Sequence, residues 1–242
     1  MNKEAKVFDE IVQNRRSIRI FDAEIPFDES AVYRSLERAI LAPNSSNLQL
    51  WEFYRVKTKA KKDELATYCL GQNAAKTANE LIVFVARKDK WKQHAEFVLN
   101  EAKKDFPAKP GKREKLLTDY YTKIIPTLYF SDPVDLTGSL KQIVSAVGGA
   151  FQPIPREVTA TDMRIVVHKS VALAAQTFML SMKAEGFDSC PMEGFDSRRV
   201  KKFLALPRAA EITMIVSVGT AKPEGVYGKR VRLPKEEVIF EI

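Results

Sequence analysis

The stretch AEGFDSCPMEGFD, residues 184–196, contains the tetrapeptide EGFD twice, and the two copies predict different structures. The first copy follows VALAAQTFMLSM at 171–182, an apolar segment without a helix breaker. Glycine adopts positive φ values at little cost, so Gly186 is expected to end a helix that covers residues 168–185. Asp188 and Ser189 are then expected to begin an exit turn.

The second EGFD copy follows Pro191, which restricts the backbone on both sides of it. Gly194 permits close approach of the backbone to another group, and Asp196 or Ser197 is expected to cap a helix over residues 197–206. A turn that leads into a helix presents free backbone N–H groups. From the turn alone, an ordinary connection between two elements is the preferred interpretation.

Apolar periodicity outside this stretch predicts further helices and strands. The helices are expected at 3–14, 31–42 and 59–70, and the strands at 51–57, 81–86, 212–219 and 238–242. The run LIVFVA at 81–86 is continuously apolar, which predicts a central strand. Strands that alternate with helices predict a mixed sheet with helices packed on it. Residues 100–160 are the least regular part, and we interpret them as an insertion or lid that carries some structure of its own.

Length and composition exclude several classes of protein. A chain of 242 residues can bury a full core, either as one large domain or as two small ones. Two cysteines and two histidines, none in a ligand cluster, give no disulfide framework and no metal site. No apolar run has the length of a membrane span, and the N-terminus lacks a signal-peptide core, so we expect an intracellular protein. The chain has no GxGxxG or GxxxxGK[ST] motif, which disfavours Rossmann and P-loop folds.

The formal charge of +8 points either to nucleic acid or to an anionic ligand. Basic residues gather in RRSIR at 15–19 and in GKRVRLP at 228–234. Arginine grips phosphate with parallel hydrogen bonds, although either cluster alone is usually surface charge. Four segments occur in a fixed order along the chain: RRSIRIF at 15–21, APNSSNLQLWEF at 42–53, AEGFDSCPMEGFD at 184–196 and RVRLP at 230–234. With this ordered set, the chain resembles the FMN-dependent nitroreductase family.

The resemblance implies a fold, a cofactor and an activity. The fold would be α+β and nitroreductase-like, a single domain over 1–242 with a central mixed or antiparallel sheet flanked by helices, in an intertwined homodimer. FMN would bind at the dimer interface. NADH or NADPH would reduce it, and a small-molecule acceptor, such as a nitroaromatic or a quinone, would then take the electrons in a ping-pong cycle. The enzyme would be cytoplasmic, with neither a nucleic-acid nor a membrane partner.

The resemblance also assigns cofactor contacts. Residues expected on the phosphate and ribityl chain are Arg15, Arg16, Ser17, Arg230 and Arg232, and Arg19 is expected at the pyrimidine edge of the ring. Residues expected near the ring are Pro191, Met192, Glu193 and Gly194, with Asn73 as a further contact, and the partner subunit would contribute Pro43, Asn44, Ser45, Ser46 and Asn47. No side chain is expected to act as a catalytic acid, base or nucleophile, because the flavin carries the chemistry. Leu50 departs from the family, which usually has proline there.

Other functions stay open from the sequence. Members of the family also use FMN for reductive dehalogenation or flavin destruction, and a non-catalytic FMN-binding or storage protein would share the same motifs. Tyr120, Tyr121, Tyr129 and Phe130 are all candidates for an aromatic ring that stacks on the substrate. The apolar segment 171–182 fits either a dimer interface or a core helix.

Overall fold

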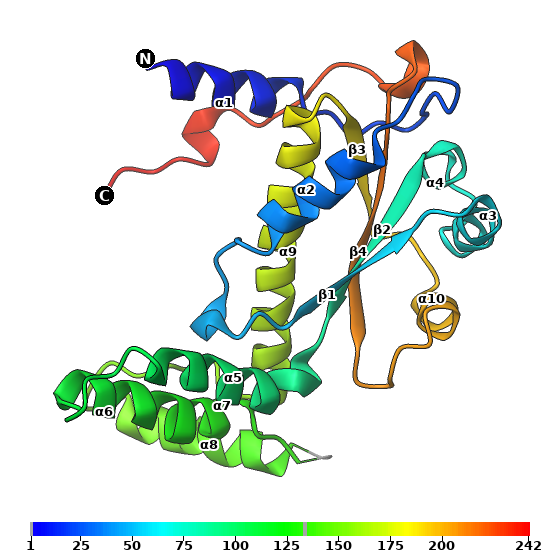
Figure 1. Ribbon diagram of the computed structural model, residues 1–242. Helices are drawn as coiled ribbons and strands as arrows, with labels where there is room; N and C mark the ends of the chain where they lie inside the picture. Colours follow the sequence, from blue (N-terminus) through cyan, green and yellow to red (C-terminus); the bar gives the residue numbers. More distant parts are fainter. Residues whose placement is uncertain (1, 133–134) are drawn as a thin grey trace.

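The computed structural model describes residues 2–132 and 135–242, and it is built around a four-stranded antiparallel sheet (Figure 1). The strand order is β1-β2-β4-β3, and the strands are β1 (Trp51–Val56), β2 (Glu80–Ala86), β3 (Asp188–Met192) and β4 (Glu211–Gly219). Each neighbouring pair is antiparallel. Of the two sheet types expected, the antiparallel one is therefore confirmed. The parallel pairing in the described part of the sheet is an isolated bridge from Ser17 to Ser189.

Both faces of the sheet are covered by helices. On one face lies α9 (Ala160–Ala184), on which α2 (Glu29–Ala39) packs, and on the other face lie α3 (Lys59–Tyr68), α4 (Asn73–Thr77) and α10 (Ser197–Phe203) (Figure 1). Strand β2 is buried along its whole length. Its alternate residues belong to the two cores: Phe84 packs against Phe178 of α9, and Val83 belongs to the core beside α3. The prediction of a central strand is confirmed.

The first EGFD copy ends α9 as expected. Gly186 has φ +87°, the N–H of Phe187 donates to the carbonyl of Met182, and the N–H of Gly186 donates to the carbonyl of Lys183. These two bonds satisfy carbonyls that the helix end leaves unpaired. The helix begins at Ala160, eight residues before the expected start, because Thr159 and Asp162 form a capping box there.

The exit turn expected at Asp188 and Ser189 is wrong, because these residues begin β3. Strand β3 lies at the edge of the sheet, where Pro191 pairs with Val216 of β4. Proline is tolerated at an edge because its missing N–H removes no bond from a central ladder. After β3, Asp196 caps α10 by accepting from the N–H groups of Arg198 and Arg199.

The region 100–160 is far more regular than its sequence suggests. Its described residues form one end of α5 (Trp91–Lys103), then α6 (Lys112–Asp119), a π-helical turn (Tyr120–Ile124), α7 (Ile125–Tyr129) and α8 (Leu136–Gly148). Figure 1 shows α5–α8 as a helical lobe at the end of the sheet away from both chain termini. The expectation that this is the least regular part of the chain is therefore wrong for the described residues, whereas its role as an insertion or lid stays a prediction. Residues 133–134 lie outside the described ranges.

The two ends of the chain lie at the opposite end of the molecule from the helical lobe (Figure 1). Helix α1 (Lys3–Asn14) has the bounds that the sequence predicts. The strand expected at 238–242 is wrong: this segment forms no ladder with the described residues, and Phe240 is exposed. A β-favouring segment needs a neighbouring strand to pair with, and the C-terminal segment runs away from the sheet.

One helix, α9, is long and apolar enough to cross a membrane by length and composition. This corrects the expectation that no apolar run has that length. Half of its most apolar window is buried against other parts of the fold, and the buried residues include Phe178 and Met182. Within one chain, α9 is therefore a core helix, although Ile165 and Leu173 remain about half exposed on its outer face.

An ion-pair cluster joins α2 to the end of α9. Glu185 accepts from Arg34, with Nη2–Oε2 at 2.6 Å, and from Arg38 Nη1, and Arg38 also donates to Ser181 Oγ. Hydrogen bonds from Arg34 and then Arg38 lower the pKa of Glu185 to about 2. The carboxylate is therefore preferred in the folded state, and this preference stabilises the contact between the two helices.

We expect Glu185→Gln to lower the free energy of unfolding by about 1–2 kcal/mol at pH 7. The folded-state pKa of Glu185 lies below its usual value of 4.5. The contribution is therefore complete above that value and is lost as the pH falls towards 2. Urea unfolding at pH 7 and at pH 3 measures both effects. Glu10→Gln, which removes an exposed glutamate without an ion pair to any described residue, should change stability at neither pH. Equal losses for the two variants would contradict this role.

Candidate flavin-binding site

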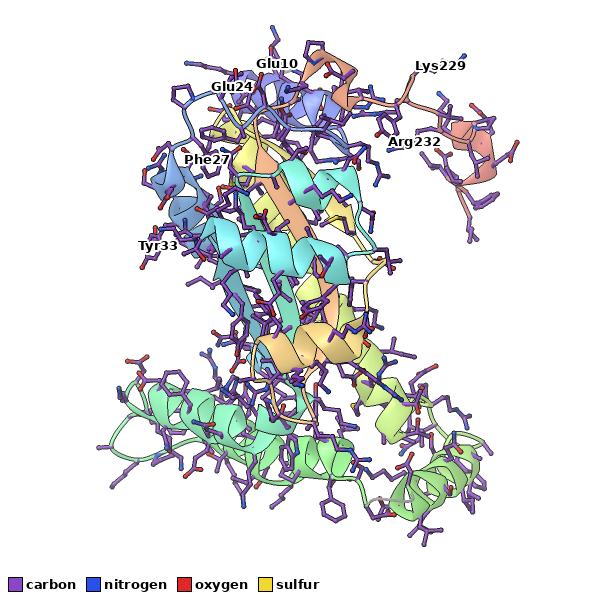
Figure 2. All side chains as sticks on the ribbon, turned by 90° about the vertical axis from the view of Figure 1, so that its right-hand side faces the viewer. Glu10, Glu24, Phe27, Tyr33, Lys229 and Arg232 are labelled. Carbon is purple, nitrogen blue, oxygen red and sulfur yellow. The ribbon has the colours of Figure 1, made fainter. Side chains whose placement is uncertain are left out.

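Basic residues from both ends of the chain line one cavity of about 220 Å³. Six cations surround it: Arg15, Arg16, Arg19, Lys229, Arg230 and Arg232. None of the six forms an ion pair with any residue in the described ranges. Figure 2 shows Lys229 and Arg232 on the C-terminal segment after it has left the sheet. The cavity therefore concentrates positive charge that the chain itself leaves uncompensated.

Backbone pairing explains how segment 15–21 reaches the C-terminal segment. The N–H of Ile18 donates to the carbonyl of Ser189 in β3 (3.2 Å), and the N–H of Arg19 donates to the carbonyl of Gly225 (2.7 Å). Side chains of Ile18 and Phe21 are buried and anchor the segment in the core. A Cβ at position 225 would lie 2.4 Å from the Ile20 carbonyl oxygen, so only glycine allows this approach.

Two of the arginines hold the cavity together. Arg230 Nη2 donates to the carbonyl oxygens of Arg15 (2.6 Å) and Gln13 (2.9 Å), and Arg16 Nη2 donates to the carbonyl of Gly228 (2.7 Å). These bonds fasten the C-terminal segment to the end of α1. Arg232, by contrast, bonds only the neighbouring Val231 carbonyl among described residues, so its charge is available to a ligand.

Like charges also perturb Arg15. Burial, followed by the charges of Arg230 and Arg232, lowers the pKa of its guanidinium. Repulsion of this kind is relieved when an anion enters, because each cation then gains an opposite charge. The electrostatics of the cavity therefore favour a multivalent anion such as a phosphate.

Strand β3, which precedes the second EGFD copy, lies beside this cavity. Arg19 and Arg15 are close enough to Cys190 for their charges to act on its thiol, although burial dominates and raises its pKa. Cys190 is fully buried. The backbone N–H groups of Glu193 and Gly194 donate to no described residue. They are therefore available to an acceptor atom of a ligand.

The start of α4 is bonded to the same turn. Gln72 Nε2 donates to the carbonyl of Gly194 (2.7 Å), which places the exposed side chain of Asn73, the next residue, near this turn. A Cβ at Gly194 would lie 3.3 Å from Gln72 Nε2, so glycine makes the contact close. Met192 is buried in the core beside α3, which leaves only its backbone for a ligand.

Residues 43–49 form a constrained loop. Ser46, Asn47 and Gln49 all have positive φ, which costs free energy for residues other than glycine. The loop is held by hydrogen bonds from outside it: Ser46 Oγ with Tyr120 Oη (2.6 Å), Tyr121 Oη to the Ser46 carbonyl (2.9 Å), and Ser45 N to Ser170 Oγ (3.3 Å). Inside it, Asn44 Oδ1 accepts from the N–H of Gln49. Pro43, Ser45 and Asn47 remain exposed.

The loop and the basic cavity do not meet within one chain. The loop lies against the middle of α9 and the helical lobe, whereas the cavity lies beyond the C-terminal end of α9, next to α1 (Figure 1). The structure thus brings together the predicted residues of both chain ends around one cavity, and it joins the turn after β3 to the start of α4. It separates them from the predicted residues 43–47.

Comparison with known proteins identifies the family. The model of the nitroreductase family matches residues 12–220. The chain belongs to the nitroreductase family. Family membership makes it an oxidoreductase. A relative named NADH dehydrogenase, from Thermus thermophilus, is 27% identical over 226 residues, which cover 93% of this chain and 91% of that protein.

Solved structures share the nitroreductase fold. The crystal structure of ydfN from Bacillus subtilis has a TM-score of 0.75 at 22% identity, covering 98% of this chain and 100% of that one. A structure from Exiguobacterium sibiricum, determined in complex with FMN, has a TM-score of 0.66 at 21% identity, with 97% of each chain covered. The α+β fold and the family expected from the sequence are confirmed.

The structure adds residues to the site and removes candidates from it. Lys229 and Tyr227 line the basic cavity, and Gln72 binds the β3–α10 turn; only Lys229 stood out in the sequence, because it is part of a basic cluster. Tyr120 and Tyr121 use their hydroxyls to hold the loop, and Tyr129 is buried against Trp91, so of the four aromatic candidates Phe130 is the exposed one. The described residues contain no cluster of metal ligands.

Proposed function

We propose that this nitroreductase-family protein is an FMN-dependent NAD(P)H oxidoreductase that acts as a homodimer. The observation that carries the proposal is a cavity lined by six cations without an ion pair to a described residue, together with a turn after β3 whose N–H groups donate to no described residue. FMN combines the two features that this arrangement suits: a phosphate, and a flat ring whose N5 region accepts hydrogen bonds. The NADH dehydrogenase name of the Thermus relative and the FMN complex of the Exiguobacterium structure support it.

The residues present fit FMN. Arg15 and Arg232 would bind the phosphate, because neither side chain is used to hold the fold. Ser17 would reach the ribityl chain together with Arg16, and Arg19 would place a cation at the pyrimidine edge of the ring, where it favours negative charge. The N–H groups of Glu193 and Gly194 would donate near N5, and Asn73 would contact the ring from the start of α4.

The cofactor carries out the chemistry, and the protein chain holds the cofactor in position. Bound FMN would supply hydride transfer from NAD(P)H to an acceptor, with NAD(P)⁺ as the other product and a proton taken up from solvent. A quinone would thereby become a hydroquinone by the net addition of two electrons and two protons. No described side chain is needed as a nucleophile. We place the reaction in the cytoplasm, where NAD(P)H is available and thiols such as Cys69 and Cys190 stay reduced.

A homodimer would complete the site. Within one chain the constrained loop 43–47 ends in exposed side chains and lies away from the basic cavity, so the loop of a second copy could approach the flavin instead. Exposed apolar groups on the outer face of α9, Ile165 and Leu173, support burial against a partner. This arrangement also explains why the loop is strained and yet held by three residues outside it, Tyr120, Tyr121 and Ser170.

We expect the purified protein to be yellow and its flavin band to bleach when NADH or NADPH is added without oxygen. A quinone added afterwards should restore the band, and steady-state consumption of NAD(P)H should depend on that quinone. A protein that binds FMN tightly but does not bleach would instead be a binding or storage protein. A colourless protein that refuses added FMN would contradict the cofactor itself.

A further inference from the structure

A second, apolar cavity lies inside the helical lobe, away from the basic site. It has a volume of about 450 Å³ and lies between α7, α8 and residues 154–158. Its wall is lined by Ile124, Leu128, Leu140, Val144, Ile154 and Val158. This volume is in the range of small-molecule sites.

Two sets of polar contacts hold this cavity open. On one side, Lys141 Nζ donates to the carbonyls of Phe130 (2.6 Å) and Leu128 (3.3 Å), which fixes α8 to the end of α7. On the other, Ser145 Oγ donates to the carbonyl of Pro155, and Arg156 Nη1 donates to the carbonyl of Ser145 (2.8 Å). The three walls are therefore tied together at their edges, and the space between them is preformed.

The same contacts define the chemistry of an occupant. Lys141 and Ser145 are polar groups in the wall, and both already have carbonyl partners. A polar ligand group placed here would lose its water without gaining a partner, which is unfavourable. A hydrocarbon chain has no polar group that would lose its water, and it gains contact with the apolar wall. Leu140 and Val144, whose side chains are about 60% exposed, are the residues that it would cover.

We propose that this cavity binds the alkyl or prenyl chain of the electron acceptor, so that the substrate is a long-chain electrophile rather than a small water-soluble one. This substrate assignment rests on the proposed reductase function, whereas binding of the chain does not. A concave, preformed wall suits a narrow chain better than the convex surface of another protein.

Calorimetric titration of the FMN-loaded protein with straight-chain alcohols from butanol to decanol tests the binding. We expect the affinity to rise about fourfold per added methylene and then to level off when the chain fills the cavity. Val144→Phe should fill the cavity and weaken octanol binding at least about tenfold. Val7→Phe, which adds the same bulk at an exposed position of α1, should leave octanol binding unchanged.

Turnover tests the substrate assignment. With a benzoquinone and its decyl derivative as acceptors, the decyl compound should have a KM at least about tenfold lower, and Val144→Phe should abolish only that advantage. Failure of octanol to bind, equal effects of the two phenylalanine variants, or equal KM values would overturn the proposal. A change of oligomeric state in Val144→Phe, without any alcohol binding, would show that a second copy covers the cavity. If no acceptor is reduced at all, the reductase function fails, and the alcohol titration still decides whether the cavity binds chains.

Discussion

Replacing Arg15 and Arg232 together by alanine is expected to weaken FMN binding by at least about 100-fold, because each charge-assisted contact to a phosphate contributes about 1.5–3 kcal/mol. Riboflavin, which has the same ring and ribityl chain but no phosphate, should lose no more than a few-fold. The two side chains are the appropriate targets because, among the described residues, neither bonds another segment, unlike Arg16 and Arg230. Fluorescence titration of both flavins with both proteins measures the difference.

The control for this variant removes the same charge elsewhere. Lys112→Ala with Arg113→Ala on α6 lowers the net charge by two in the helical lobe, and it should change neither FMN nor riboflavin binding. Raising the salt concentration should weaken FMN binding to the native protein more than to the double arginine variant, because screening acts on charges that the variant lacks. Equal losses for FMN and riboflavin would show that the two arginines support the fold and do not bind a phosphate.

Much of the fold could be predicted from the sequence because its signals are local. The strands β1, β2 and β4 lie within two residues of their expected positions, since each is a run of apolar or aromatic side chains. Strand β3 could not be found this way. Its sequence, DSCPM, disfavours strands, and its conformation depends on the ladder that it forms with β4. The segment 238–242 shows the reverse case, since it favours strands but has no neighbour to pair with among described residues.

The candidate site likewise contains features that the sequence predicts and features that it does not. Basic residues at both chain ends were visible in the sequence, and their convergence on one cavity was expected from the family resemblance. What the sequence could not show is the role of Gly225, which lets the two segments meet, or of Tyr120 and Tyr121, whose hydroxyls hold a loop. The π-helical turn at Tyr120–Ile124 places the two tyrosines side by side on that loop. These are contacts between residues distant in the chain, and no local pattern encodes them.

The separation of the loop from the basic cavity leads to the second large effect. Ser45→Ala with Asn47→Gly removes the exposed side chains of the loop and keeps its backbone, because glycine tolerates the positive φ at position 47. If the loop serves the partner's flavin, this variant should bind FMN about tenfold more weakly or worse, as expected when polar contacts to a ligand are lost. The Arg15→Ala/Arg232→Ala variant instead removes the phosphate contacts, which one chain supplies while its partner supplies the loop.

A hybrid of the two variants distinguishes a shared site from a site within one chain. The Arg15→Ala/Arg232→Ala chain and the Ser45→Ala/Asn47→Gly chain, each with its own affinity tag, are co-expressed and purified as a mixed dimer. In such a dimer one site combines both defects, while the other combines intact arginines from one chain with an intact loop from its partner. At an FMN concentration near the native Kd, the hybrid should therefore reach about half the native occupancy, although each parent dimer remains nearly empty. If each chain built its own site, every site in the hybrid would carry a defect, and no FMN would be recovered.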